Sequence, residues 1–75
     1  MLKSEIYEVL AKRQDCNAKT LQNPSEHDYL SKYFKKTVDD AESVEDIKND
    51  LNYAISMLQN SLSELSSYED KTIIK

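Results

Sequence analysis

The sequence predicts an all-α protein, and three observations carry that prediction. The 75 residues include no glycine and one proline, Pro24, whereas sheets and compact loops use glycine wherever the backbone needs a positive φ. Apolar residues recur at spacings of three and four rather than in alternation. Ser and Asp stand where helix N-caps are needed. We expect one helical domain over residues 1–75: a small three-helix bundle, or a helical hairpin with an additional N-terminal helix.

The first helix is predicted at about residues 2–19. The Asn23-Pro24 pair ends this region, because the residue before a proline avoids the helical conformation. We expect Cys16 to lie on the helix as a small buried hydrophobe. The expected apolar face consists of Leu2, Ile6, Val9, Leu10 and Cys16.

The second helix is predicted at about residues 26–41, with Ser25 as its N-cap. Three pairs of opposite charge at four-residue spacing mark its outer face: Asp28 with Lys32, Lys35 with Asp39, and Lys36 with Asp40. Its broad apolar face is expected to hold Tyr29, Leu30, Tyr33, Phe34, Val38 and Ala41.

The third helix is predicted at about residues 44–68, with Ser43 as its N-cap and residues 70–75 as a tail. Its apolar spacing continues over about six turns, which makes it the expected spine of the bundle with the second helix as its best-packed neighbour. The stripe comprises Val44, Ile47, Leu51, Ala54, Ile55, Leu58, Leu62 and Leu65.

The short length of the chain limits the hydrophobic core that it can build by itself. Leu, Ile, Val and Phe make up 17 of the 75 residues. This fraction is just above the roughly 20% below which charged chains are typically disordered. A single cysteine allows no disulfide framework within one chain. We therefore expect self-association or a partner protein to supplement a marginal core.

Charge and hydropathy narrow the range of partners. The net charge is −4, whereas nucleic-acid binding normally requires a basic face. No stretch approaches the about 18 consecutive apolar residues of a membrane span, and the N-terminus does not resemble a signal peptide. We expect a cytoplasmic protein with neither nucleic acid nor membrane as its partner.

No constellation predicts catalysis, a cofactor or a metal site. Ser25, His27 and Asp28 have the residue types of a hydrolase triad, but side chains this close on a helix point in different directions. Cys16 and His27 show no metal-ligand spacing. The sequence therefore favours a protein that is not an enzyme.

The C-terminal helix carries the strongest functional pattern. Thirteen consecutive residues, Leu51 to Ser63, are uncharged, and Tyr53, Met57 and Tyr68 form a second apolar strip beside the aliphatic stripe. Tyr and Met are enriched in contact surfaces. The predicted partner-binding residues are Tyr53, Met57, Leu58, Leu62 and Tyr68.

The leading interpretation is a non-enzymatic protein–protein interaction module: a small chaperone, adaptor or inhibitor. A first alternative is a homodimer with a structural role, in which the C-terminal helix pairs with its own copy. A second alternative is an acidic inhibitor that mimics DNA. That alternative depends on the carboxylates of Asp39, Asp40, Glu42, Glu45, Asp46 and Asp50.

Overall fold

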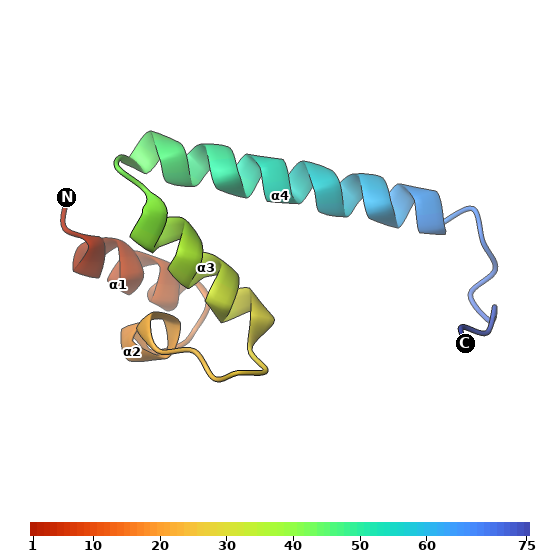
Figure 1. Ribbon diagram of the computed structural model, residues 1–75, viewed down its shortest axis with the longest axis horizontal. Coiled ribbons are helices and arrows are strands. Elements are labelled where there is room, and N and C mark those ends of the chain that lie inside the picture. Colours follow the sequence, from red (N-terminus) through yellow and green to blue (C-terminus); the bar gives the residue numbers. More distant parts are fainter.

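The computed structural model describes residues 1–75 and contains four helices and no strand. The predicted all-α fold is confirmed. The three predicted helices do not form a single bundle, however. The first predicted helix is divided into two, and the last extends away from the others (Figure 1). The helices are α1 (Lys3–Arg13), α2 (Ala18–Gln22), α3 (Tyr29–Asp40) and α4 (Val44–Leu65).

The molecule has a packed part and an extended part. Figure 1 shows α1, α2 and α3 grouped together, while α4 starts beside the end of α3 and runs away from the group. The radius of gyration is 15.3 Å, against about 11 Å for a compact domain of this length. The long dimension of 45 Å follows α4 and the segment after it.

The helix predicted over residues 2–19 is broken at residues 14–17 by a C-terminal cap. Asp15 adopts a positive φ of 54°, and the N–H of Cys16 donates to the carbonyl of Ala11 at 2.9 Å. This is the Schellman pattern, with aspartate in the position that glycine usually fills. Asn17 then caps α2 by accepting a hydrogen bond from the N–H of Lys19 at 2.8 Å. Cys16 therefore lies exposed between two helices and not in the core.

The start of α3 also differs from the prediction. Asp28 and not Ser25 is the N-cap, and its carboxylate accepts a hydrogen bond from the N–H of Ser31 at 3.1 Å. The carbonyl of Ser25 accepts from the N–H of Asp28 at 3.1 Å, which places residues 25–28 in a turn. Asp28 stands directly before the first residue of α3, where its carboxylate reaches a free N–H group of the first helical turn. Ser25 lies three residues earlier, in the turn that precedes the helix.

The start of α4 agrees with the prediction. The Ser43 hydroxyl accepts a hydrogen bond from the N–H of Asp46 at 3.3 Å. The Asp46 carboxylate in turn accepts from the N–H of Glu42 at 2.9 Å. Acidic side chains in the first turn also complement the positive end of the helix dipole. The helix ends at Leu65, so Tyr68 lies beyond it rather than inside as predicted.

The core is small and lies where α1, α2, α3 and the beginning of α4 meet. Seven of the 75 residues are buried, so the core cannot be larger than a few side chains per helix. Leu2 and Val9, which the predicted face of the first helix includes, are instead exposed. The buried apolar cluster consists of Tyr7, Ala11, Leu21, Val38 and Ile47.

The prediction that the C-terminal helix is the spine of the bundle is wrong. Among the helices, α4 lies close to α3 alone, and Ile47 is its only buried residue. The best-buried side chains, Leu21 and Val38, come from α2 and α3. We call α1, α2, α3 and residues 44–54 the body, and the rest of α4, Ile55–Leu65, the arm.

Candidate interaction surface on α4

The arm exposes a continuous apolar surface. From Ile55 to Lys75 every residue is exposed, although the aliphatic spacing of the body part of α4 continues. Exposure of the four large aliphatic side chains ranges from 51% to 70%. We call these four residues the exposed stripe: Ile55, Leu58, Leu62 and Leu65.

Helix geometry explains why the stripe is one surface. At 100° per residue, its four side chains fall within a sector of about 80°, and Ile47 lies in the same sector. The face of α4 that is buried at Ile47 therefore continues uncovered along the arm. Ile55 and Leu65 are predicted as core residues and Leu58 and Leu62 as partner-binding residues, but nothing in the chain covers any of the four.

Helix lengths and directions explain why α3 covers only the first part of α4. The 12 residues of α3 extend for about 18 Å, whereas the 22 residues of α4 extend for about 33 Å. The two helices also diverge from the elbow at residues 41–43 (Figure 1). The Tyr33 hydroxyl donates to the carbonyl of Asp50 at 2.9 Å. This hydrogen bond links α3 to α4, and it marks how far from the elbow α3 stays in contact with α4.

The predicted partner-binding residues do not form one patch. Leu58 and Leu62, 70% and 69% exposed, stand at the centre of the stripe. Met57 lies beside the stripe, and Tyr68 follows the end of the helix. Tyr53 is on another side of α4, where it lines a shallow depression with Tyr33 of α3.

Ile55 and Leu65 belong to the exposed surface although the sequence assigned them to the core. The spacing of apolar residues is identical for a buried and an uncovered helix face, so periodicity cannot separate the two. The signal that does separate them is the uncharged run from Leu51 to Ser63, because it extends farther than α3 can reach.

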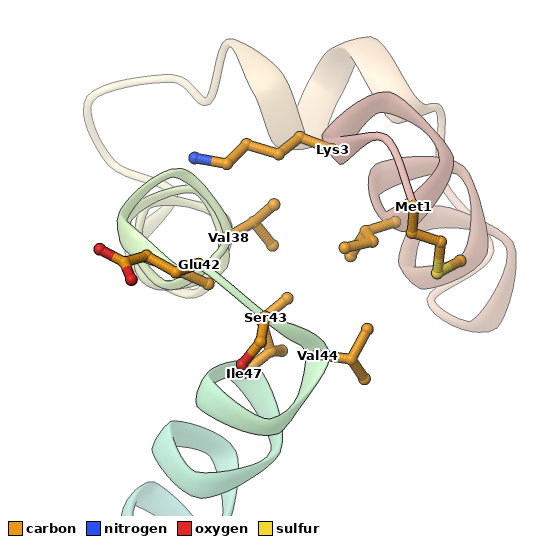
Figure 2. Close-up of a pocket in the computed structure, with 9 residues that line it drawn as sticks. Met1, Lys3, Val38, Glu42, Ser43, Val44 and Ile47 are labelled. Carbon is orange, nitrogen blue, oxygen red and sulfur yellow. The ribbon is translucent and has the colours of Figure 1, made fainter.

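A second hollow lies at the elbow between α3 and α4. Figure 2 shows Lys3 reaching across Val38 towards α3, with Met1 and Val44 at its other side. The hollow has a volume of about 140 Å³ and is lined by both apolar and polar residues. Ligand pockets usually measure about 300–1,000 Å³, so this space is a gap in packing rather than a pocket of that size.

A polar network fixes α1 to α3 within the body. The buried Tyr7 hydroxyl donates to the Asp39 carboxylate at 2.7 Å and approaches the Lys35 carbonyl at 3.2 Å. Lys35 pairs with Asp39 at 2.6 Å, and Lys3 donates to the Asp39 carbonyl. Burial raises the pKa of Tyr7 well above its ordinary value, and the Asp39 carboxylate adds to that shift. The hydrogen bond from Lys35, followed by that from Tyr7, lowers the pKa of Asp39.

Half of the acidic group has partners within the chain. Asp39 is held by Lys35 and Tyr7, and Asp40 pairs with Lys36 at 3.0 Å. The Asp46 carboxylate accepts from the N–H of Glu42. Two of the three charge pairs predicted for α3 are confirmed, and these carboxylates are parts of caps and ion pairs in addition to being surface charge.

The remaining motifs stay apart from the stripe. The hydrogen bond from the N–H of Ser31 lowers the pKa of Asp28, which agrees with a capping role. Instead of pairing with Asp28, Lys32 lies over the Tyr29 ring, 5.5 Å from its centroid. Tyr29 and Leu30 are exposed, contrary to the predicted apolar face of α3.

No cluster of three or more His, Cys, Asp or Glu residues is arranged to hold a metal ion. None of the helices has the length and apolar composition that crossing a membrane requires.

No relative identifies the chain. Comparisons with protein-family models, curated proteins and solved structures find no match. Any proposal of function therefore depends on the structure of the chain itself.

Proposed function

We propose that this protein is a non-enzymatic interaction module, such as a small chaperone, adaptor or inhibitor, that binds a partner protein through the apolar face of α4. The observation that carries the proposal is the exposed stripe, Ile55, Leu58, Leu62 and Leu65, on a helix without charge from Leu51 to Ser63. Contiguous apolar surface rimmed by polar residues marks protein interaction sites in soluble proteins. Serine, asparagine and glutamine form that rim on the arm.

Burial of the stripe supplies the driving force. Full burial of one large aliphatic side chain contributes about 1.5–3 kcal/mol relative to its exposed state. Leu58 and Leu62 are central and act as the anchors, while Met57 and Tyr68 extend the contact on one side. Tyr53 makes a contact only with a partner large enough to reach the α3 side of the helix.

Binding also stabilises the arm itself. Isolated helices of fewer than about 12–15 residues are marginal in water, and the arm has no ion pair to support it. The Ser61 and Ser66 hydroxyls donate to the carbonyls of Met57 and Leu62, a pattern that weakens helices slightly. A partner that covers the stripe therefore rigidifies the arm as it binds.

The cytoplasm is the compartment that we propose for this interaction, and a protein is the class of partner. An exposed lone thiol at Cys16 agrees with a reducing environment. The net charge of −4 disfavours nucleic acid. The acidic-mimic alternative has less support, because Asp39, Asp40 and Asp46 are engaged within the chain.

The proposal is tested by capture with a tagged chain from the cells that produce it. The stripe variant carries Leu58→Glu and Leu62→Glu. The matched control carries Ser56→Glu and Asn60→Glu, which add the same two charges to the opposite face of α4. We expect the wild type and the control to retain the same bound protein, a second copy of the chain included, and the stripe variant to lose it.

Two outcomes contradict the proposal. Equal capture by both variants would show that the partner binds elsewhere. Failure of the wild type to bind any protein, including its own copy, would show that the stripe is not a docking surface.

A further inference from the structure

We propose that the shallow depression between α3 and α4 binds a basic side chain of a partner protein, arginine in preference to lysine. The inference rests on the proposed function for one point, that the ligand belongs to a protein. The depression is separate from the exposed stripe, because Tyr53 lies about 160° around α4 from the centre of the stripe. Six residues line it: Tyr33, Lys36, Thr37, Asp40, Asp50 and Tyr53.

Thr37 is the residue that points to a ligand, because it is only 5% exposed and its hydroxyl is free. The hydroxyls of Ser61 and Ser66 donate to carbonyls one turn earlier, whereas that of Thr37 makes no hydrogen bond within the chain. No side-chain oxygen that is sealed from solvent lacks a partner, so the Thr37 hydroxyl opens into the depression that this residue lines. A nearly buried hydroxyl with free donor and acceptor capacity is suited to a hydrogen bond with a ligand.

The charge of the depression favours a cation. Its lining contains two aspartates and one lysine, which gives one net negative charge. Lys36 pairs with Asp40 at 3.0 Å. Asp50 has no ion pair, because the one other pair of the chain joins Lys35 to Asp39. An ammonium or guanidinium group that enters the depression would therefore balance the remaining negative charge.

Two tyrosine rings add a second attraction for a cation. The Tyr33 ring is held in place, since its hydroxyl donates to the Asp50 carbonyl at 2.9 Å and its edge contacts Phe34 with centroids 6.1 Å apart. Tyr53 lines the depression from α4 and is mostly exposed, so its ring is open to a ligand. Cations are attracted to the faces of such rings, and the planar guanidinium also stacks on them, which favours arginine over lysine.

The size of the depression fits one side chain. Its volume of about 270 Å³ is below the about 300–1,000 Å³ of pockets that hold small molecules. It lies between α3 and the proposed docking helix α4, so one partner can reach both surfaces.

Titration with N-acetyl-arginine amide tests the inference, with nuclear magnetic resonance of the tyrosine rings and the Thr37 methyl group as the readout. The N-acetyl amides of lysine, leucine and glutamate are compared with it at equal concentrations. We expect arginine to shift the signals of Tyr33, Thr37 and Tyr53, and lysine to shift them less. Leucine and glutamate should leave them unchanged.

Three variants test the residues of the depression. Asp50→Asn removes a charge but keeps the carbonyl that Tyr33 binds, and should weaken arginine binding about threefold. Thr37→Val removes the free hydroxyl and should weaken binding by about the same factor without loss of stability, because no hydrogen bond within the chain is broken. Asp70→Asn, the matched control, removes a charge from the segment after α4 and should leave binding unchanged.

Each other result overturns the inference. Unchanged signals with arginine would show that the depression does not bind a basic side chain. Equal shifts with glutamate or leucine would show that charge has no part in the binding. An Asp50→Asn variant that binds as tightly as Asp70→Asn would exclude the free carboxylate, and a Thr37→Val variant that loses stability would show that the hydroxyl serves the fold.

The outcome is separate from that of the capture experiment. If arginine does not bind but capture through the stripe persists, this inference fails and the proposed function stands. If arginine binds but the wild type captures no protein, the stripe proposal fails, and with it the assignment of the ligand to a partner protein.

Discussion

The body and the arm share the helical spacing of apolar residues, but those residues are buried in the body and exposed in the arm. In the body, Leu21 and Val38 are fully buried where α1, α2 and α3 pack together. In the arm, Leu58 and Leu62 repeat the same apolar spacing and remain about 70% exposed. The difference teaches that periodicity states which face of a helix is apolar, while chain topology decides whether anything covers it.

The largest expected difference between the two regions comes from removing a leucine. Leu21→Ala deletes a fully buried side chain and should lower the free energy of unfolding by about 2–5 kcal/mol. Leu62→Ala, its matched control on the arm, should change it by less than about 0.5 kcal/mol at concentrations where the chain is monomeric. Urea unfolding followed by tyrosine circular dichroism measures both. Equal losses would place Leu62 in an intramolecular core.

A second comparison uses two tyrosines. Tyr7→Phe removes the hydroxyl that binds Asp39 and the Lys35 carbonyl in the body, and should cost about 1–2 kcal/mol of stability. Tyr68→Phe removes an exposed hydroxyl beyond α4 and should leave the stability of the monomer unchanged. The same unfolding experiment measures both variants. A neutral Tyr7→Phe variant would mean that the link between α1 and α3 contributes nothing.

A third comparison uses two serines, one at the N-cap of α4 and one in the arm. Ser43→Ala removes the acceptor for the N–H of Asp46 and should cost about 1 kcal/mol. Ser56→Ala, near the start of the arm, has no cap to remove and should raise helicity slightly, because alanine has the higher helix propensity. Thermal unfolding by far-ultraviolet circular dichroism measures both. If Ser43→Ala costs no stability, Ser43 does not act as a cap.

The smallest expected effect is a dependence on pH that only the body shows. The pKa of Tyr7 is raised above 10.0 in the folded protein, so its contribution is complete below 10.0 and is lost as pH rises further. The pKa of Asp39 is lowered below 3.8, so its contribution is present above 3.8 and is lost as pH falls through the lowered value.

Urea midpoints across the alkaline range test the first of these effects. The wild type and a Tyr53→Phe control should lose stability in parallel above pH 10.0, whereas Tyr7→Phe should lose less. If Tyr7→Phe follows the wild type, the loss does not arise from Tyr7.

Sequence reasoning gave the helical class, the start of α4 at Ser43 and two ion pairs of α3, because these are local properties. It missed the break at Asp15, because an aspartate with positive φ replaces the glycine that normally marks such a cap. It also placed Ile55 and Leu65 in a core. The direction in which α4 leaves the elbow depends on tertiary packing at residues 41–47, which periodicity does not encode.

Residue-level amide hydrogen exchange, followed by nuclear magnetic resonance at low and high protein concentration, tests most directly whether the arm is an uncovered helix. We expect the amides of the body to be protected equally at both concentrations. The amides of Leu58 to Leu65 should exchange rapidly in the dilute sample and become protected when a second copy or another partner covers the stripe. Arm amides as protected as those of the body in the dilute monomer would contradict the uncovered arm, because a neighbour within the same chain would then have to cover the stripe.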